Sequence, residues 1–135
     1  MALALAIHVT DEALTGFLGV YNPTVLALRA KLGFWPMPTF EFRDWLGGLI
    51  TGIVVLLALS PFVFRGMRWI RPIFYLVAIL AGVLNALGHT VGTILGHSVS
   101  TVHFSRPAPG FYSSPLLLIV AIYALLQLWH TRKTS

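Results

Sequence analysis

The chain has 135 residues, of which 57% are hydrophobic and 10% are charged, and it contains no cysteine. Soluble domains carry about 25% charged residues, so this composition indicates an integral membrane protein that contacts the lipid bilayer. The net charge of +5 comes from Lys and Arg in predicted loops and the tail, which suits lipid headgroups and excludes nucleic acid as a partner. The lack of cysteine excludes disulfides and thiolate metal ligands.

The length fits four membrane spans and leaves no room for a separate soluble domain. A helix needs about 20 apolar residues to cross the hydrocarbon core, and backbone groups in lipid must be satisfied within the helix. We therefore predict one all-α domain over residues 1–135, built as a multi-pass transmembrane four-helix bundle. The predicted spans are residues 2–20, 44–64, 72–97 and 112–129.

The first span is predicted to end at Asn22-Pro23, because this pair is typical of a turn. The span lacks a basic start and carries charges at its centre, so we expect it to be retained rather than cleaved as a signal peptide. Residues 24–35 then mix apolar side chains with Arg29 and Lys31. This segment is either an amphipathic helix in the membrane interface or a loop packed over the bundle.

The later spans have recognisable starts. Glu41 and Asp44 favour a helix N-terminus at the second span, which is expected to close near Ser60-Pro61. Pro72 suits the first turn of the third span, and residues 98–111 are expected to form a loop. Basic residues slightly favour cytoplasmic termini, since five lie on the side of the termini and four on the other. The five are Arg65, Arg68, Arg71, Arg132 and Lys133, and the four are Arg29, Lys31, Arg43 and Arg106.

Three ionisable side chains, His8, Asp11 and Glu12, lie inside the first apolar stretch. Positions i, i+3 and i+4 of a helix share one face, so these side chains are predicted to form one polar patch. Insertion scales give a cost of about 2.5–3.5 kcal/mol for a charged group at the centre of a span, so such residues usually mark function. The patch is the strongest functional indication in the sequence.

Asn85 and His89 form a second polar pair, on one face of the third span. If both helices begin at the same membrane surface, Glu12 lies about 15 Å deep and Asn85 about 20 Å, with His8 near 9 Å and His89 near 25 Å. Glu12, Asn85 and His89 can then meet near the bilayer middle, whereas contact between His8 and His89 needs tilt or a register shift. The small-residue spacing Gly88, Gly92 and Gly96 predicts close packing on a neighbouring helix and permits an oligomer.

These motifs resemble the HXXEE-domain membrane proteins. The elements read His8-Val9-Thr10-Asp11-Glu12, Asn85-Ala86-Leu87-Gly88-His89 and Pro109-Gly110, and their order covers most of the chain. Asp11 stands where that family usually has glutamate. The resemblance implies a membrane-embedded site at His8, Asp11, Glu12, Asn85 and His89, and it names no reaction.

We interpret the cluster as the site of a small membrane enzyme that acts on a lipid-like or hydrophobic substrate. Glu12 or Asp11 would be the general acid or base, His89 would shuttle a proton or bind metal, and Asn85 would orient a group. A divalent metal is the cofactor that the side chains suit, with His8, Glu12 and His89 as ligands. The spacing matches no specific metal signature, so metal-free acid–base chemistry stands beside it.

Two other functions stay open. A proton-coupled small transporter or ion pathway would use a titrating carboxylate within the membrane, and a structural or haem-binding subunit would use paired histidines. The remaining histidines, His97, His103 and His130, are expected at the interface in structural or solvated roles. His97 is the one most able to join the site, because it lies two turns from His89.

Overall fold

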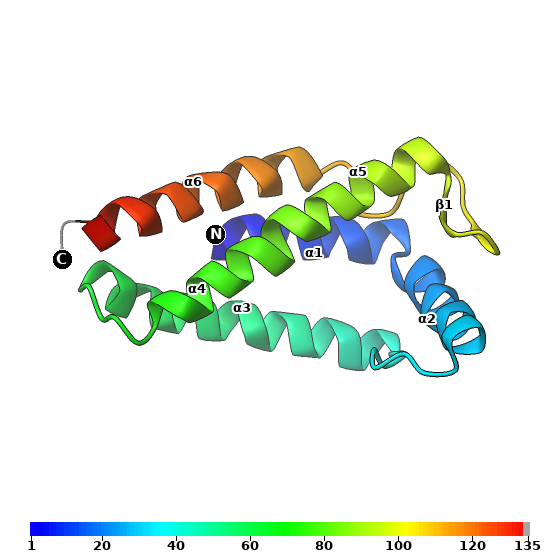
Figure 1. The fold of residues 1–135 in the computed structure, drawn as a ribbon, viewed down its shortest axis with the longest axis horizontal. Coiled ribbons are helices and arrows are strands. Elements are labelled where there is room, and N and C mark those ends of the chain that lie inside the picture. Colours follow the sequence, from blue (N-terminus) through cyan, green and yellow to red (C-terminus); the bar gives the residue numbers. More distant parts are fainter. Residues whose placement is uncertain (134–135) are drawn as a thin grey trace.

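The computed structural model describes residues 1–133 and is mostly helical. Most of the helical segments run roughly along the long axis of the molecule, whereas helix α2 (Leu18–Leu32) turns away at one end (Figure 1). Its elements in chain order are α1 (Ala2–Thr15), α2 (Leu18–Leu32), α3 (Phe42–Phe64), α4 (Arg71–Val77), the π-helix η1 (Ala78–Leu84), α5 (Asn85–Leu95), β1 (His97–Val99), β2 (Val102–His103) and α6 (Ser114–Lys133).

Two helices are long and apolar enough to cross a membrane, and a bent pair is a possible third. The two are Phe42–Phe64 and the continuous unit Arg71–Leu95, which agree closely with the predicted second and third spans. The bent pair is α1 with α2, and the apolar part of α6, Ser114–His130, is shorter. Residues 1–133 therefore contain two or three candidate spans by length and composition, which is compatible with a membrane protein.

The predicted end of the first span was wrong. Helix α1 ends at Thr15, because Gly16 adopts a left-handed conformation (φ 78°) that closes the helix, and α2 then leaves at an angle of 84°. Asn22-Pro23 lies inside α2 instead of ending a helix. Pro23 costs one backbone hydrogen bond, but the Asn22 side chain holds this turn in place by bonding both the N–H and the carbonyl of Phe40.

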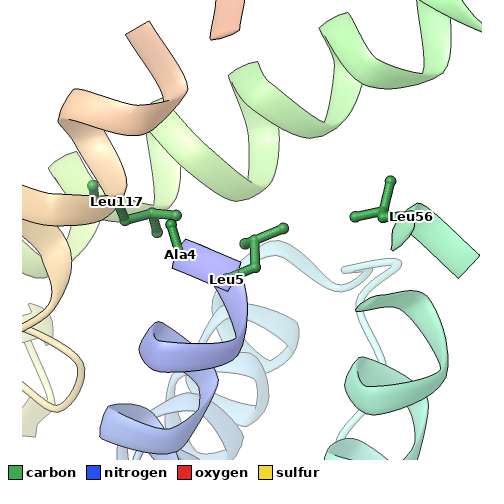
Figure 2. Packing of buried hydrophobic residues seen from close by; sticks show 5 residues of the cluster. Ala4, Leu5, Leu56 and Leu117 are labelled. Carbon is green, nitrogen blue, oxygen red and sulfur yellow. The ribbon is translucent and has the colours of Figure 1, made fainter. Parts of the chain in front are cut away.

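The apolar core lies around the first turns of α1. Ala4 and Leu5 pack with Leu56 of α3, Ala86 of α5 and Leu117 of α6, and all five are buried. Figure 2 shows Ala4 and Leu5 between Leu117 on one side and Leu56 on the other. The start of α1 is thus enclosed by the three longer helical units.

Close helix packing occurs at Gly82 rather than along the predicted glycine stripe. A Cβ atom at Gly82 would lie 2.5 Å from Cβ of Ala121, so α6 approaches η1 there as only glycine allows. A Cβ atom at Gly88 would meet nothing within 4 Å, and Gly92 faces Phe104 and Ala108 of the following loop. Among the described residues, a Cβ atom at Gly88 or Gly92 would therefore meet no neighbouring helix within 4 Å.

The predicted loop at residues 98–111 contains a small hairpin. Strands β1 and β2 pair antiparallel, with His97 opposite His103. The hairpin contacts α2, so both lie at the same end of the molecule (Figure 1). Residues 104–113 then lead back along the bundle to α6.

Candidate functional site

Helix α1 buries one stripe that changes from apolar to polar along its length. The buried residues are Ala4, Leu5, His8, Val9 and Glu12, which recur at the three- and four-residue spacing of one helix face. His8 is fully buried and Glu12 is 4% exposed, although both are polar. Since buried polar groups are costly without partners, the groups that face them define the site.

The partners of the stripe come from α5, as predicted, but at a different depth. The Met1 side chain lies against Gly82, since a Cβ atom there would be 2.9 Å from Cε of Met1. Gly82 is roughly 16 Å along the third helical unit from Arg71, at 1.5 Å per residue. Helix α1 therefore begins about 16 Å further along the bundle than the third helical unit does. This offset brings His8 level with His89, although the predicted depths of the two residues differed because both helices were assumed to begin at the same membrane surface.

Glu12 lies between the two histidines. Its Oε1 atom is 3.0 Å from Nε2 of His89 and 3.4 Å from Nε2 of His8. The two imidazole rings meet edge to face, with centroids 4.9 Å apart. His8, Glu12 and His89, called the triad below, form one buried cluster contributed by two helices.

The residue types and the spacing of the triad would suit a metal ion. One ligand atom from each of its three residues lies within 4.8 Å of the other two, and all three residues are buried. Two imidazoles and a carboxylate are ligands for zinc, iron or manganese. The triad can also act without metal, because His89 can pass a proton to or from the Glu12 carboxylate across 3.0 Å.

Asn85 joins the site through His8 rather than through Glu12. Its Nδ2 amide lies 2.9 Å from Nε2 of His8, so it can donate a hydrogen bond to that nitrogen. This assignment requires Nε2 of His8 to carry no proton, and the other side of the same ring is arranged accordingly.

A hydrogen-bonded relay holds the far side of the His8 ring. Oγ of Ser113 lies 2.8 Å from Nδ1 of His8 and donates to Oδ2 of Asp11, also at 2.8 Å. The backbone N–H of Ser113 donates to the same carboxylate oxygen. Because the single hydroxyl proton is used on Asp11, Nδ1 of His8 is the donor to Ser113 and Nε2 is left as an acceptor.

The predicted patch of His8, Asp11 and Glu12 therefore divides in two. Glu12 faces His89, whereas Asp11 faces Ser113 at the start of α6. Asp11 and Glu12 face different neighbours because adjacent residues of an α-helix project about 100° apart around its axis. Of the five predicted residues, four meet around the triad and Asp11 reaches it only through Ser113.

Sequence reasoning missed Ser113, Thr15 and the structural part played by Gly110. Gly110 has a φ of +80°, and a Cβ atom there would lie 2.8 Å from Cε1 of His89 and 2.9 Å from Cγ of Glu12. Its backbone N–H donates to Oγ1 of Thr15 on α1. The Pro109-Gly110 pair was noted only as part of a family pattern, and Ser113 carried no distinguishing signal.

A pocket of about 390 Å³ lies beside the triad. Asn85 and His89 line the side next to the triad, and α2, α5 and the segment after α5 supply the rest. Other polar residues in the lining are Tyr21, Thr24, His97 and Ser98. The lining is mainly apolar and aromatic, including Phe17, Leu84, Val91, Leu95 and Phe104. Its size falls in the range of pockets that bind small organic molecules, about 300–1,000 Å³.

The remaining histidines lie outside the triad. His97 and His103 face each other across the hairpin, with ring centroids 5.5 Å apart, and His130 is exposed. His97 lines the pocket, and its buried Nδ1 has no hydrogen-bond partner among the described residues. His97 thus borders the same cavity as His89 without touching the triad.

No family model, curated protein or solved structure matches the chain.

Proposed function

We propose that the chain is a multi-pass integral membrane protein of the HXXEE-domain type. In this arrangement α1, α3, α4–α5 and α6 pack as a four-helix unit within the bilayer, and α2 lies in the interface with Arg29 and Lys31 toward headgroups. The contacts of α1 with α3 and α6, and of α6 with η1 and α5, support it. The loop at residues 65–71 and the end of α6 would face the cytoplasm, in keeping with their basic residues.

The function proposed is that of a small membrane enzyme acting on a lipid-like or hydrophobic substrate. One observation carries this proposal: a buried cluster of two histidines and a carboxylate adjoins the wall of a mainly apolar pocket. Polar groups that only tie helices together need no adjacent cavity. An apolar pocket with a few convergent polar groups is the usual form of a binding site for a small molecule.

The residues take different parts in this function. His89 lines the pocket, so it is the acid–base group that touches the substrate, and Glu12 accepts or returns the proton behind it across 3.0 Å. Asn85 also lines the pocket and orients a polar group of the substrate or the His8 ring. The low-dielectric surroundings strengthen each of these interactions relative to water.

Occupancy of the pocket tests the binding part of the proposal. Gly88 lines the pocket and a Cβ atom there meets nothing within 4 Å, so Gly88→Leu is chosen to place a side chain in the cavity. Native mass spectrometry of protein purified from its own membranes is expected to show a bound hydrophobic molecule in the wild type and none in Gly88→Leu. Gly52→Leu is the matched control, because Gly52 also has free space at its Cβ but lies on α3 outside the pocket.

Turnover is tested by lipid profiles of cells that carry single variants. Glu12→Gln keeps the shape of the side chain and removes its acid–base function, so the substrate should accumulate, whereas the exposed control Glu41→Gln should match the wild type. Unchanged profiles in Glu12→Gln and His89→Gln cells, with both proteins folded at normal levels, would contradict an enzymatic function.

A further inference from the structure

We infer that His8, Glu12 and His89 bind one divalent transition-metal ion, with an open coordination position toward the pocket. The inference deepens the proposed enzyme by naming its cofactor class, and it rests on that proposal only for the use of the open position. The ligand set, its geometry, its charge and the support behind His8 each favour a metal over a simple hydrogen-bonded cluster.

The spacing of the ligand atoms fits a tetrahedral ion. With bonds of about 2.0–2.2 Å to nitrogen and oxygen, two ligands of tetrahedral zinc lie roughly 3.3 Å apart. The two distances from Oε1 of Glu12 to the histidine nitrogens are 3.0 and 3.4 Å. The third separation, between the two histidine ligand atoms, is at most 4.8 Å. The two rings would therefore have to approach each other by at most about 1.5 Å to surround an ion.

His8 is held as metal-bound histidines usually are. A ligating imidazole normally donates its second N–H to a carboxylate, a carbonyl or a water, which fixes the ring and leaves the other nitrogen free for the metal. Here Nδ1 of His8 donates to Ser113, and Ser113 donates to Asp11. Nε2 of His8 now accepts a hydrogen bond from Asn85. A metal ion would take over this lone pair, and the Asn85 amide would then turn to another acceptor.

The charge of the site also calls for a cation. As ionised groups, Glu12 brings a negative charge to a buried position and Asp11 brings another to a partly buried one. Among the described side chains of residues 1–130, only the imidazoles of His8 and His89 lie within ion-pair distance of Glu12. Buried charges need compensation because desolvation costs several kcal/mol per ion. A divalent ion with neutral imidazoles balances the two carboxylates.

Three protein ligands with an open fourth position are typical of catalytic rather than structural zinc. The same two-histidine, one-carboxylate set also serves non-haem iron(II). Because His89 and Asn85 form the pocket wall, the open position is available to an oxygen atom of water or of a hydrophobic substrate. Metal would displace the proton shared by His89 and Glu12, so binding should release protons.

Metal binding to the wild-type protein is the first test. The detergent-purified protein is stripped with a chelator and dialysed against Zn²⁺ or Co²⁺, and the bound metal is measured by mass spectrometry. We expect one equivalent bound with submicromolar affinity, proton release, and a Co²⁺ visible spectrum of low coordination number. X-ray absorption of the Zn²⁺ form should show two imidazole ligands, and this measurement needs no variant.

Variants with matched controls locate the site. Glu12→Gln and His89→Ala should weaken Zn²⁺ binding further than the ~10–100-fold expected for an outer-shell change. Glu41→Gln and His103→Ala should bind as the wild type does, since Glu41 is an exposed acid and His103 belongs to the other histidine pair. Circular dichroism in detergent identifies any variant that fails to fold.

Ser113 is a positioning residue, and its test must separate orientation from folding. Ser113→Ala should weaken Zn²⁺ binding by ~10–100-fold and shift the Co²⁺ spectrum, whereas Ser113→Thr, which keeps the hydroxyl, should restore both. A spectrum that is identical in Ser113→Ala would contradict the positioning role of the relay.

The metal and the enzyme can fail separately. Absence of bound Zn²⁺ and Co²⁺ in the folded wild type, or equal loss in His103→Ala, would overturn the metal site. If the lipid profile still depended on Glu12, the enzyme proposal would survive that result. Conversely, the wild type could bind Zn²⁺ while Gly88→Leu retains the bound hydrophobic molecule and Glu12→Gln leaves the lipid profile unchanged. That result would support the metal site and contradict the enzyme.

Discussion

The two halves of α1 share one buried stripe but have opposite chemistry. Ala4 and Leu5 meet apolar side chains from three helices, whereas His8 and Glu12, one and two turns further, meet Asn85, His89 and Ser113. Helical period decides which residues of α1 are buried. The residues opposite each turn decide whether that burial makes a core or a site.

The halves also differ in what holds them together. The apolar half depends on filled volume, so it should tolerate changes that conserve size. The polar half depends on directed bonds, and removal of one partner leaves another buried group unsatisfied at about 1–3 kcal/mol. Changes of similar size in the two halves should therefore have different effects on stability and on metal binding.

The largest effect is expected at Gly110, which packs on the polar half. Gly110→Ala forces a side chain into a left-handed conformation and against His89 and Glu12, at a cost of roughly 3–4 kcal/mol. Gly33→Ala has a similar φ of +71° and free space, so it should lose only about 1–2 kcal/mol. Unfolding in detergent measures both, and equal losses would show that close packing at Gly110 is unimportant.

A cavity in the apolar half should reduce stability without touching the site. Leu117 is fully buried in the core, and Leu117→Ala should cost about 2 kcal/mol, near the lower end for buried leucine because detergent is itself apolar. The neighbouring Leu116→Ala, at 43% exposure, is the control and should change little. Zn²⁺ stoichiometry should stay at the wild-type value in both, and its loss in Leu117→Ala would mean that the halves are coupled.

A substitution at Asp11 tests the polar half of α1 through the relay of Ser113 and Asp11 behind His8. Asp11→Asn keeps an oxygen for Ser113 but removes the negative charge, so Zn²⁺ affinity should fall about tenfold, or 1.4 kcal/mol, with little change in unfolding temperature. The exposed Asp44→Asn provides the charge-matched control. Isothermal titration with Zn²⁺ measures both, and equal affinities would exclude a contribution of the relay charge.

The smallest effect is expected at Thr15, which joins the end of α1 to Gly110. Thr15→Val removes the hydroxyl that accepts from the Gly110 N–H and should cost about 1 kcal/mol. Thr10→Val is closely matched, since both threonines donate to the carbonyl four residues earlier but only Thr15 binds across the fold. Equal stabilities of the two variants in chemical unfolding would contradict a specific tie at Thr15.

The sequence predicts the long helices well because their signals are local. The apolar runs, together with Pro72 at the start of the third unit, place α3 and Arg71–Leu95 within a few residues. The end of α1 was misplaced because Gly16 and Asn22-Pro23 are both plausible helix ends. Tertiary bonds from Asn22 to Phe40 decide between them, and local propensity contains no information about those bonds.

The sequence predicted four of the polar residues that the structure brings together, but neither the residues around them nor their arrangement. Spacing alone pairs His8 with Glu12 and Asn85 with His89, since each pair is one turn apart. The level at which the two helices meet depends on the contact of Met1 with Gly82, and the relay depends on Ser113, over a hundred residues from His8. Neither contact leaves a periodic signal in the sequence.

The offset of α1 also gives the site a sidedness. His89 is roughly 25 Å along the third unit from Arg71, since the residues of η1 rise less than those of an α-helix, and this is most of the ~30 Å thickness of a hydrocarbon core. In the proposed membrane arrangement, the pocket beside α2 and the hairpin therefore exchanges ions and substrate with the compartment opposite the Arg71 end. A carrier would need a second opening through the core of Leu5, Leu56 and Leu117, whereas an enzyme supplied from one leaflet needs no such opening.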